Sequence, residues 1–208
     1  MTRWSAGTRI MARTLFAAAC VVASAIAAAG EQKYEPLSAS VQAALHNSVA
    51  DQASPRLAFA SDAEGIAWLA AMSKRMEKHV PDVAARVDLL TTVHYEATRA
   101  GLDPQLVLGV IQVESEFRKY AISKAGARGY MQVMPFWIRS IGVPSHNLFA
   151  LRTNLRYGCV ILRHYLNVEN GDYFRALGRY NGSLGRPEYP NAVNAAWQGP
   201  WKYDGAKS

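Results

Sequence analysis

The chain has 208 residues, half of them hydrophobic, and its 23 Lys and Arg against 16 Asp and Glu give a net charge of +7. This length and composition exclude a disordered chain and allow one folded domain with short additions. The basic residues form no stripe with interleaved aromatic residues, so we expect no nucleic-acid partner.

The first 30 residues are typical of a secretory signal peptide. Arg3, Arg9 and Arg13 precede an apolar stretch, TLFAAACVVASAIAAA, that contains small-x-small cleavage candidates. An uncleaved anchor is the alternative, although about 16 apolar residues are slightly short to span a bilayer. We expect residues 1–29 to be removed, leaving no integral membrane span, and the protein to reach the periplasm or cell envelope of a bacterium. The remaining chain carries 20 basic and 16 acidic residues, a net charge of +4 that suits an anionic cell-surface polymer.

The rest of the chain shows helical patterns almost throughout. Residues 30–60, with breakers at Pro36 and Pro55, are predicted to form a loosely attached N-terminal extension with one helix near 38–50. Seven helices are predicted beyond it: from Ser61 or Asp62 to about His79, from Pro81 to before Gly101, from Asp103-Pro104 past Glu114, from Pro135 to Ile141, from about Leu151 to Val168, from Asp172 over YFRALGRY, and from Pro190 over NAVNAAW. A short β segment near Tyr130–Val133 is conceivable. The fold is therefore predicted to be mostly α, with a single domain over residues 61–208.

Cysteine and histidine give little sign of chemistry. Cys159 shares a helical face with Leu155, Leu162 and Leu166, so a buried structural thiol is favoured over a nucleophile. The five histidines are scattered without a His-Glu-x-x-His motif, and His94 is predicted to be a hydrogen-bonded core residue. We therefore expect no metal site and no cofactor.

The segment GVIQVESEF places a carboxylate in an apolar helical stretch. Residues three and four apart share a helical face, which puts Glu114 in one apolar stripe and Glu116 toward solvent. The other members of the stripe are Val107, Val110, Ile111 and Phe117. A carboxylate in apolar surroundings is costly when ionised, so its pKa should rise and it could act as a general acid. A buried Glu bonded to backbone groups or to an Arg is the alternative.

Two later segments carry further candidates. In SKAGARGYMQVMPF, the spacing of Gly126 and Gly129 suggests a tight loop that approaches a ligand, and the Gln132 amide suits sugar hydroxyls. An ordinary loop is the alternative. In RALGRYNGSLG, Tyr180 and Asn181 fall at a predicted helix end, where a plain C-cap is the alternative.

In this order, the three segments resemble the soluble lytic transglycosylase family, which is related in fold to goose-type lysozyme. The family pattern begins with a Glu-Ser pair, here Glu114-Ser115, and continues with residues matched by Phe117, Ala121 and Ser123. A Gly-Ala-x-Gly-Leu-Met-Gln-x-Met-Pro run follows as GARGYMQVMP, and an Ala-Tyr-Asn-Ala-Gly element appears as RYNGS. The resemblance covers about residues 65–200. It departs from the pattern at Tyr130, where Leu is usual, and at the residues flanking Tyr180-Asn181.

The resemblance implies a lysozyme-like catalytic domain that cleaves the bond between N-acetylmuramic acid (MurNAc) and N-acetylglucosamine (GlcNAc) in peptidoglycan glycan strands. The product would carry a 1,6-anhydro ring. Glu114 would be the sole catalytic acid/base, and the hydroxyl of Tyr180 would approach it. The family positions that contact substrate, or orient the acid, fall on Ser115, Ser123, Gln132, Met134, Tyr180, Asn181 and, by a looser alignment, Glu188. We expect the protein to act as a monomer.

Three questions stay open in the sequence. Most glycosidases use two carboxylates, and Asp172, Glu116 or Glu188 could supply a second one in space. A goose-type muramidase that hydrolyses the same bond, and a wall-binding assembly protein without turnover, are alternative functions; an intact Glu114 argues against the second. Trp68 is predicted to be a core residue, whereas Trp197 and Trp201 could be core or could stack on sugars.

Overall fold

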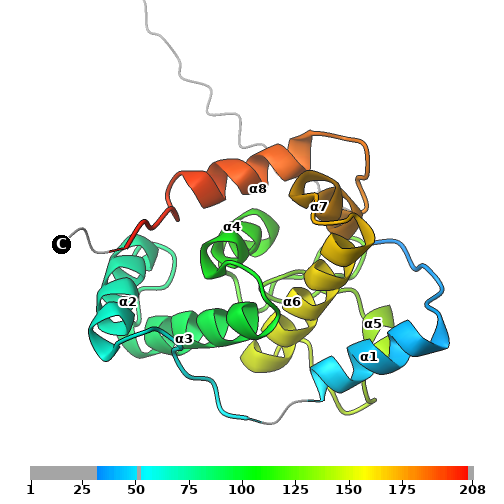
Figure 1. The fold of residues 1–208 in the computed structure, drawn as a ribbon, viewed down its shortest axis with the longest axis horizontal. Helices are drawn as coiled ribbons and strands as arrows, with labels where there is room; N and C mark the ends of the chain where they lie inside the picture. Colours follow the sequence, from blue (N-terminus) through cyan, green and yellow to red (C-terminus); the bar gives the residue numbers. More distant parts are fainter. Residues whose placement is uncertain (1–31, 51–52, 206–208) are drawn as a thin grey trace, which may run out of the picture.

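The computed structural model describes residues 32–50 and 53–205; the predicted signal peptide lies outside them. Its helices are α1 (Ala39–Val49), α2 (Asp62–Met76), α3 (Val83–Arg99), α4 (Pro104–Ser115), α5 (Phe136–Ile141), α6 (Leu151–Val168), α7 (Tyr173–Asn181) and α8 (Glu188–Gln198). The described residues contain no strand, only isolated bridges from Arg128 to Ile122 and to Val133. The prediction of a mostly α fold is confirmed. In Figure 1, α4 lies in the middle of the molecule with α2, α3, α6, α7 and α8 around it.

Capping side chains set most helix starts. Ser61, Asp103 and Asp172, all predicted caps, each accept a hydrogen bond from a backbone N–H in the first turn of α2, α4 and α7. Two predicted starts are wrong. Helix α3 begins after Pro81, where Asp82 caps it, and α8 begins at Glu188 with Pro190 inside its first turn. A first turn tolerates proline because its N–H groups have no partner within the helix.

Helices α4 and α8 pack closely because of a glycine. A Cβ atom on Gly109 would lie 3.1 Å from the backbone nitrogen of Trp197 and 3.2 Å from the carbonyl oxygen of Val193. The absence of a side chain therefore lets the two helix backbones approach each other. This crossing brings the first turn of α8 to the C-terminal end of α4.

Two tryptophans fasten α8 and the segment after it to α4. The indole N–H of Trp197 donates to Oδ2 of Asp103 over 2.9 Å, at the start of α4. The indole N–H of Trp201 donates to Oε1 of Gln112 over 2.6 Å, near the end of α4. Trp201 is 1% exposed and Trp197 is partly buried, so both serve the packing of α8 on α4.

The N-terminal extension is not loosely attached over α1. Leu45 and Val49 belong to the hydrophobic core. Arg99 of α3 donates to the carbonyl oxygen of Ser48 over 2.8 Å, and Arg156 of α6 donates to that of Val49 over 3.3 Å. Cations at a helix C-terminus are favoured by the helix dipole. The expectation of a loose segment is therefore wrong for this helix.

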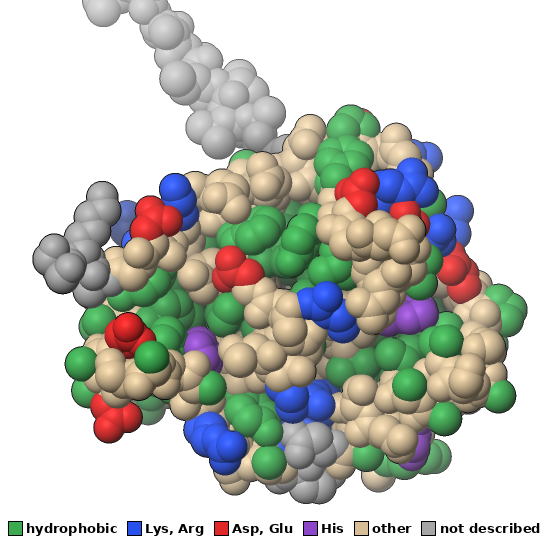
Figure 2. Space-filling view, in the orientation of Figure 1, with side chains coloured by type: hydrophobic (Ala, Val, Ile, Leu, Met, Phe, Trp, Pro, Cys, Tyr) green, Lys and Arg blue, Asp and Glu red, His purple; other side chains and the backbone are tan. Residues whose placement is uncertain are grey.

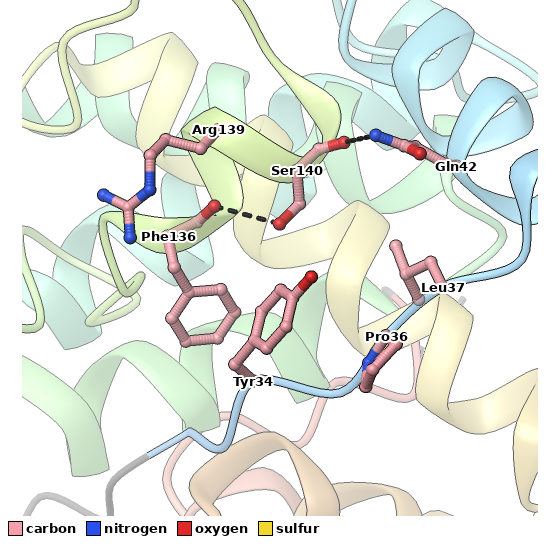
Figure 3. Close-up of a pocket in the computed structure, with 7 residues that line it drawn as sticks. All are labelled: Tyr34, Pro36, Leu37, Gln42, Phe136, Arg139 and Ser140. Carbon is pink, nitrogen blue, oxygen red and sulfur yellow. Dashed lines mark hydrogen bonds between the residues drawn. The ribbon is translucent and has the colours of Figure 1, made fainter.

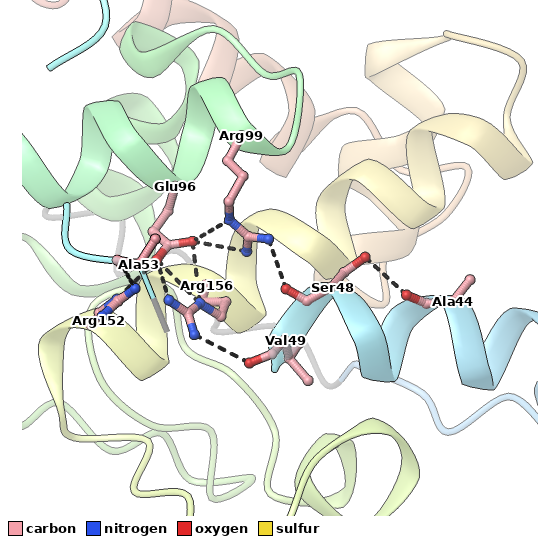
Figure 4. Close-up of polar contacts among 8 residues, drawn as sticks. All are labelled: Ala44, Ser48, Val49, Ala53, Glu96, Arg99, Arg152 and Arg156. Atoms are coloured by element: carbon pink, nitrogen blue, oxygen red, sulfur yellow. Dashed lines mark hydrogen bonds and ion pairs between the residues drawn. The ribbon is translucent and has the colours of Figure 1, made fainter. Parts of the chain in front are cut away.

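A buried carboxylate organises those arginines. Glu96 is fully buried, and its carboxylate lies 3.0 Å from Arg99, 3.1 Å from Arg156 and 3.6 Å from Arg152 (Figure 4). A buried charge needs such partners, since an unpaired one would be costly. The cluster joins α3, α6 and the end of α1. Its members lie up to 60 residues apart, so the sequence did not reveal it.

Other single residues are placed largely as predicted. Trp68 and Cys159 are buried in the core, and burial raises the pKa of the Cys159 thiol, which keeps it unreactive. His94 is 4% exposed and stacks on Phe59, and burial lowers its pKa. Its Nδ1 atom has no hydrogen-bond partner within the described chain, so the predicted bonding is not seen at that atom.

Three properties of the described residues concern nucleic-acid, membrane and metal binding. On the face seen in Figure 2, acidic and basic side chains lie in small dispersed groups, without a continuous basic stripe. No helix among the described residues is both long and apolar enough to cross a bilayer. Within the same residues, no group of three His, Cys, Asp or Glu side chains is arranged to hold a metal ion.

Candidate active site

The Glu114 carboxyl lies where three helices meet. Glu114 is the next-to-last residue of α4, and its side chain is largely buried. The hydroxyl of Tyr189, in the first turn of α8, donates to Oε1 of Glu114 over 2.6 Å. The side chain of Asn181, the last residue of α7, forms a second hydrogen bond with the same carboxyl. Residues from two other helices therefore hold this acid in place.

Burial raises the pKa of Glu114 from its usual 4.5 to about 7. Loss of water penalises the charged carboxylate, as expected for an acid on an apolar helical face. The hydrogen bonds from Tyr189 and Asn181 lower the pKa, because they stabilise the ionised form, but their effect is smaller. Near neutral pH the carboxyl is divided between its two forms and can both give and take a proton.

The chain reverses directly after this acid. Glu116 and Phe117 both have left-handed backbone conformations, with φ of 51° and 62°. Such residues cost about 1–3 kcal/mol each unless the surroundings hold them. Here Phe117 is buried against the rings of Trp201 and His79, at centroid distances of 5.3 and 5.0 Å. The reversal ends α4 one residue after Glu114, and Glu116 is exposed as predicted.

Ser115 connects the end of α4 to the glycine-rich loop. It is 1% exposed, and its Oγ lies 2.7 Å from the carbonyl oxygen of Tyr130 and 3.1 Å from that of Ile111. The hydroxyl therefore faces the interior, behind Glu114. This position suits the orienting role and not direct contact with a bound sugar.

The loop around Gly129 is tight because it closes on a buried side chain. Gly129 has a φ of 75°, and a Cβ there would lie 2.4 Å from Nδ2 of Asn154. Asn154, on α6, accepts the N–H of Met131 and donates to the carbonyls of Arg128 and Leu148, each over 2.8 Å. The predicted close approach of the loop backbone is therefore seen at Gly129, but the group that it approaches is the Asn154 side chain. No local sequence pattern marks Asn154 as the partner of this loop.

The polar side chains of this loop are used within it. Ser123 accepts a hydrogen bond from a backbone N–H four residues on. Gln132 is 4% exposed, and its amide donates to the carbonyls of Gly129 and Ala121 over 2.8 and 3.2 Å. The Gln132 amide is therefore turned away from any ligand. The groups that this segment presents are main-chain ones, the carbonyl of Gln132 and the N–H of Met134.

Tyr180 and Asn181 have different roles from each other. The Tyr180 hydroxyl is fully buried and donates to the carbonyl oxygen of Met131 over 2.7 Å. The expectation was that this hydroxyl approaches Glu114, and the charge of Glu114 does raise the pKa of Tyr180. The hydroxyl that donates to the Glu114 carboxyl is that of Tyr189. By fixing α7 to the loop, Tyr180 leaves the next residue, Asn181, facing the carboxyl.

None of the three candidate second carboxylates takes part in this arrangement. Glu116 and Glu188 are exposed, and Asp172 caps α7 by accepting the N–H of Arg175 over 3.0 Å. The pKa of Glu114 responds to burial and to two neutral side chains, with no carboxylate of the described residues among the causes.

Two neighbours of the site were not found by sequence reasoning. Tyr189 lies 75 residues from Glu114, and a tyrosine in an apolar helix is usually a core residue. Gln32 lies in the extension, yet it is 5% exposed and contacts Gln132, Met134 and Trp137. The one signal that could mark Gln32 is its burial in a stretch of prolines and charged residues. Burial is not visible in the sequence.

A sequence model of the family described as "Transglycosylase SLT domain" matches residues 91–196, just over half of the chain. The matched region runs from the middle of α3 into α8. It includes Glu114, Asn181 and Tyr189.

Individual relatives match shorter parts. A protein named transglycosylase from Enterobacteria phage PRD1 is 35% identical over 98 residues, covering 47% of this chain and 36% of the phage protein. Membrane-bound lytic murein transglycosylase C of Actinobacillus pleuropneumoniae serotype 5b is 45% identical over 62 residues, 30% of this chain and 16% of that protein. The X-ray structure of an inactive mutant of lytic transglycosylase Slt from Pseudomonas aeruginosa is 25% identical with a TM-score of 0.41, covering 54% of this chain and 20% of that one. The matched part of the chain thus covers 36%, 16% and 20% of the lengths of these three proteins.

Proposed function

The chain belongs to the transglycosylase SLT domain family, and we propose on this basis that it is a lytic transglycosylase acting on peptidoglycan. The proposed reaction cleaves the MurNAc–GlcNAc glycosidic bond and leaves a 1,6-anhydro-MurNAc end. Glu114 is the proposed single general acid/base. The observation that carries this proposal is its largely buried carboxyl, with a pKa of about 7, held by Tyr189 and Asn181 and by no charged group.

In the first step, protonated Glu114 donates its proton to the glycosidic oxygen while the bond from that oxygen to C1 of MurNAc breaks. A pKa of about 7 keeps a large share of the carboxyls protonated at neutral pH, as a general acid requires. Because Tyr189 donates to Oε1, a proton on the other oxygen is favoured. The leaving GlcNAc keeps the transferred proton on its hydroxyl.

In the second step, ionised Glu114 takes the proton of the C6 hydroxyl of the same MurNAc. That oxygen attacks C1 and closes the 1,6-anhydro ring, so the carboxyl is protonated again and no water is consumed. Between the two steps, the hydrogen bonds from Tyr189 and Asn181 stabilise the ionised form, since both lower the pKa of Glu114.

The lack of a second carboxylate at Glu114 supports this route over ordinary hydrolysis. Retaining glycosidases hold two carboxyl groups about 5–5.5 Å apart and inverting ones about 6.5–9.5 Å apart. Among the described residues, neither Glu116, Asp172 nor Glu188 influences Glu114. An enzyme with one acid needs a nucleophile from the substrate, and the C6 hydroxyl supplies it.

The proposal extends to the setting of the enzyme. Names of relatives refer to murein and to membrane attachment, which suits the predicted signal peptide. We propose export to the bacterial cell envelope, a catalytic domain over residues 61–208, and an extension over residues 30–60 whose helix α1 packs on that domain.

Digestion of purified peptidoglycan tests the reaction. The exported protein is incubated with peptidoglycan sacculi and the released muropeptides are weighed by mass spectrometry. Anhydro products, lighter by one water than hydrolytic ones, are expected. Reducing ends would instead identify a muramidase, and no release from folded protein would indicate a wall-binding protein. Glu114→Gln, checked for folding by circular dichroism, is the inactive control.

A further inference from the structure

Residues 32–37 form an extended segment, here called the N-terminal strap, that runs from the neighbourhood of α7 to the start of α1 (Figure 1). Within the described chain, no backbone group of the strap forms a hydrogen bond. Lys33 to Pro36 are exposed, Leu37 is partly buried against the core, and only Gln32 is almost fully buried. Segments held without backbone hydrogen bonds and with few buried groups detach at low free-energy cost.

The side-chain carboxamide of Gln32 contacts two main-chain groups and one indole N–H. Its Oε1 accepts from the indole N–H of Trp137 over 3.0 Å and lies 3.4 Å from the N–H of Met134. Its Nε2 donates to the carbonyl oxygen of Gln132 over 3.5 Å. Two of these three contacts are long, so they hold the strap only weakly.

Gln32 and the proposed acid are neighbours of the same hydroxyl. The pKa of Tyr180 is raised by burial and by the charge of Glu114, and lowered by a hydrogen bond with Gln32. Tyr180 itself donates to the carbonyl of Met131, and Gln32 contacts the next residue, Gln132, and Met134 two residues further on. Gln32 therefore lies beside Tyr180, and the residue after Tyr180, Asn181, is hydrogen-bonded to the Glu114 carboxyl.

The rest of the strap contacts α5 on one side and α7 on the other. The ring of Tyr34 stands edge-on to that of Phe136 at the start of α5, with centroids 5.7 Å apart (Figure 3). Glu35 pairs with Arg179 of α7 over 3.2 Å. A cavity of about 500 Å³ lies between the strap and α5, and another of about 240 Å³ lies between the strap and the α7–α8 loop, which follows Asn181. The strap thus separates two hollows on either side of it.

The groups around Gln32 match an N-acetyl group. A glutamine carboxamide and the acetamido group of an amino sugar both present one carbonyl acceptor and an N–H donor on a planar amide. The N–H groups of Met134 and Trp137 would serve the acetamido carbonyl, and the carbonyl of Gln132 would serve its N–H. Both sugars of the substrate proposed above carry such a group.

We propose that the strap is a built-in pseudosubstrate: the Gln32 carboxamide fills the place of a sugar N-acetyl group near Glu114, and a glycan strand binds by displacing it. This proposal rests on the proposed function for the identity of the sugar. As a consequence, the apparent affinity for the glycan is reduced, because only molecules with a displaced strap can bind it. The strap is held at its far end by α1, so a displaced strap stays close and can return.

A binding experiment without turnover tests the strap. A β-1,4-linked hexamer of N-acetylglucosamine is titrated by calorimetry into the exported Glu114→Gln protein, with and without Gln32→Ala. Loss of the seated carboxamide is expected to tighten binding by about three- to tenfold, the range that corresponds to one net hydrogen bond of strap seating. In the active protein, the half-saturating peptidoglycan concentration is expected to fall by a similar factor with kcat unchanged.

Two further variants complete the design. Gln42→Ala is the matched control, because Gln42 also belongs to the N-terminal extension and donates its amide to a carbonyl, that of Ser140 over 2.7 Å (Figure 3), but contacts none of the groups that hold Gln32. It should leave binding unchanged. Glu35→Gln breaks the exposed ion pair with Arg179 and should tighten binding by less, about twofold. This variant stays informative if Gln32→Ala does not fold.

The outcomes distinguish the pseudosubstrate proposal from the proposed reaction. Unchanged or weaker hexamer binding by folded Gln32→Ala and Glu35→Gln would overturn the pseudosubstrate proposal. The strap would then be a permanent part of the folded domain. Equal tightening by Gln42→Ala would also overturn it. Tighter binding together with hydrolytic products would support the strap and contradict only the proposed reaction, since the titration needs no cleavage.

Discussion

Replacing Glu114 by Gln should abolish turnover and, above neutral pH, stabilise the fold. The amide cannot exchange a proton, yet it keeps the shape of the acid and an oxygen to accept the hydrogen bond of Tyr189. It also removes a carboxylate that the folded protein must hold in largely apolar surroundings. Loss of activity should therefore come with a gain in stability, as is common where a site is strained for function.

The magnitude follows from the pKa of Glu114. In the folded protein this pKa is about 7, against 4.5 for an ordinary glutamate. A raised pKa means that the folded state holds the proton more tightly, so the contribution of this group to stability is complete below about pH 4.5 and is lost as pH rises through 7. A shift of this size corresponds to about 3 kcal/mol. Glutamine carries no such dependence.

Urea unfolding of the two proteins from about pH 4.5 to about pH 8, followed by circular dichroism, measures the effect. The free energies of unfolding should be similar at the acid end and differ by about 3 kcal/mol at the alkaline end. For a chain of this size this is about 6–12 °C in Tm. Parallel pH dependences for the two proteins would refute the reasoning, because Glu114 would then have an ordinary pKa in the folded state.

Two more substitutions test the surroundings of the acid. Tyr189→Phe removes a hydrogen bond that lowers the pKa of Glu114, so the alkaline limb of the kcat/KM profile should move from about 7 to higher pH; an unmoved limb would contradict the assignment. Gly129→Ala should cost more than about 3 kcal/mol of unfolding free energy, because its methyl group meets buried atoms at 2.4 Å and its φ is 75°. Gly126→Ala, with a φ of 88° and open space, should cost only about 1–2 kcal/mol; equal losses in urea titrations would count against the packing at Gly129.

The strap and the loop show where reasoning from sequence was misled. Residues 30–60 carry proline breakers and few apolar residues, which indicated a loose extension. For α1 the Glu96 cluster overrules that prediction, through contacts between residues 60 to 107 positions apart in the chain. Gln132 was expected to offer its side chain, and a left-handed backbone with φ of 48° turns that side chain into the loop instead.

The sequence by itself determined the local features of this protein. Capping residues set the starts of α2, α4 and α7, and helical periodicity placed Glu114 on an apolar face, because both depend on residues within one or two turns. Its raised pKa followed from the same periodicity. Only the tertiary structure decided which groups surround the carboxyl. Tyr189 reaches Glu114 because the missing side chain of Gly109 lets α8 approach α4, and no local pattern contains the result of packing between helices so far apart in the chain.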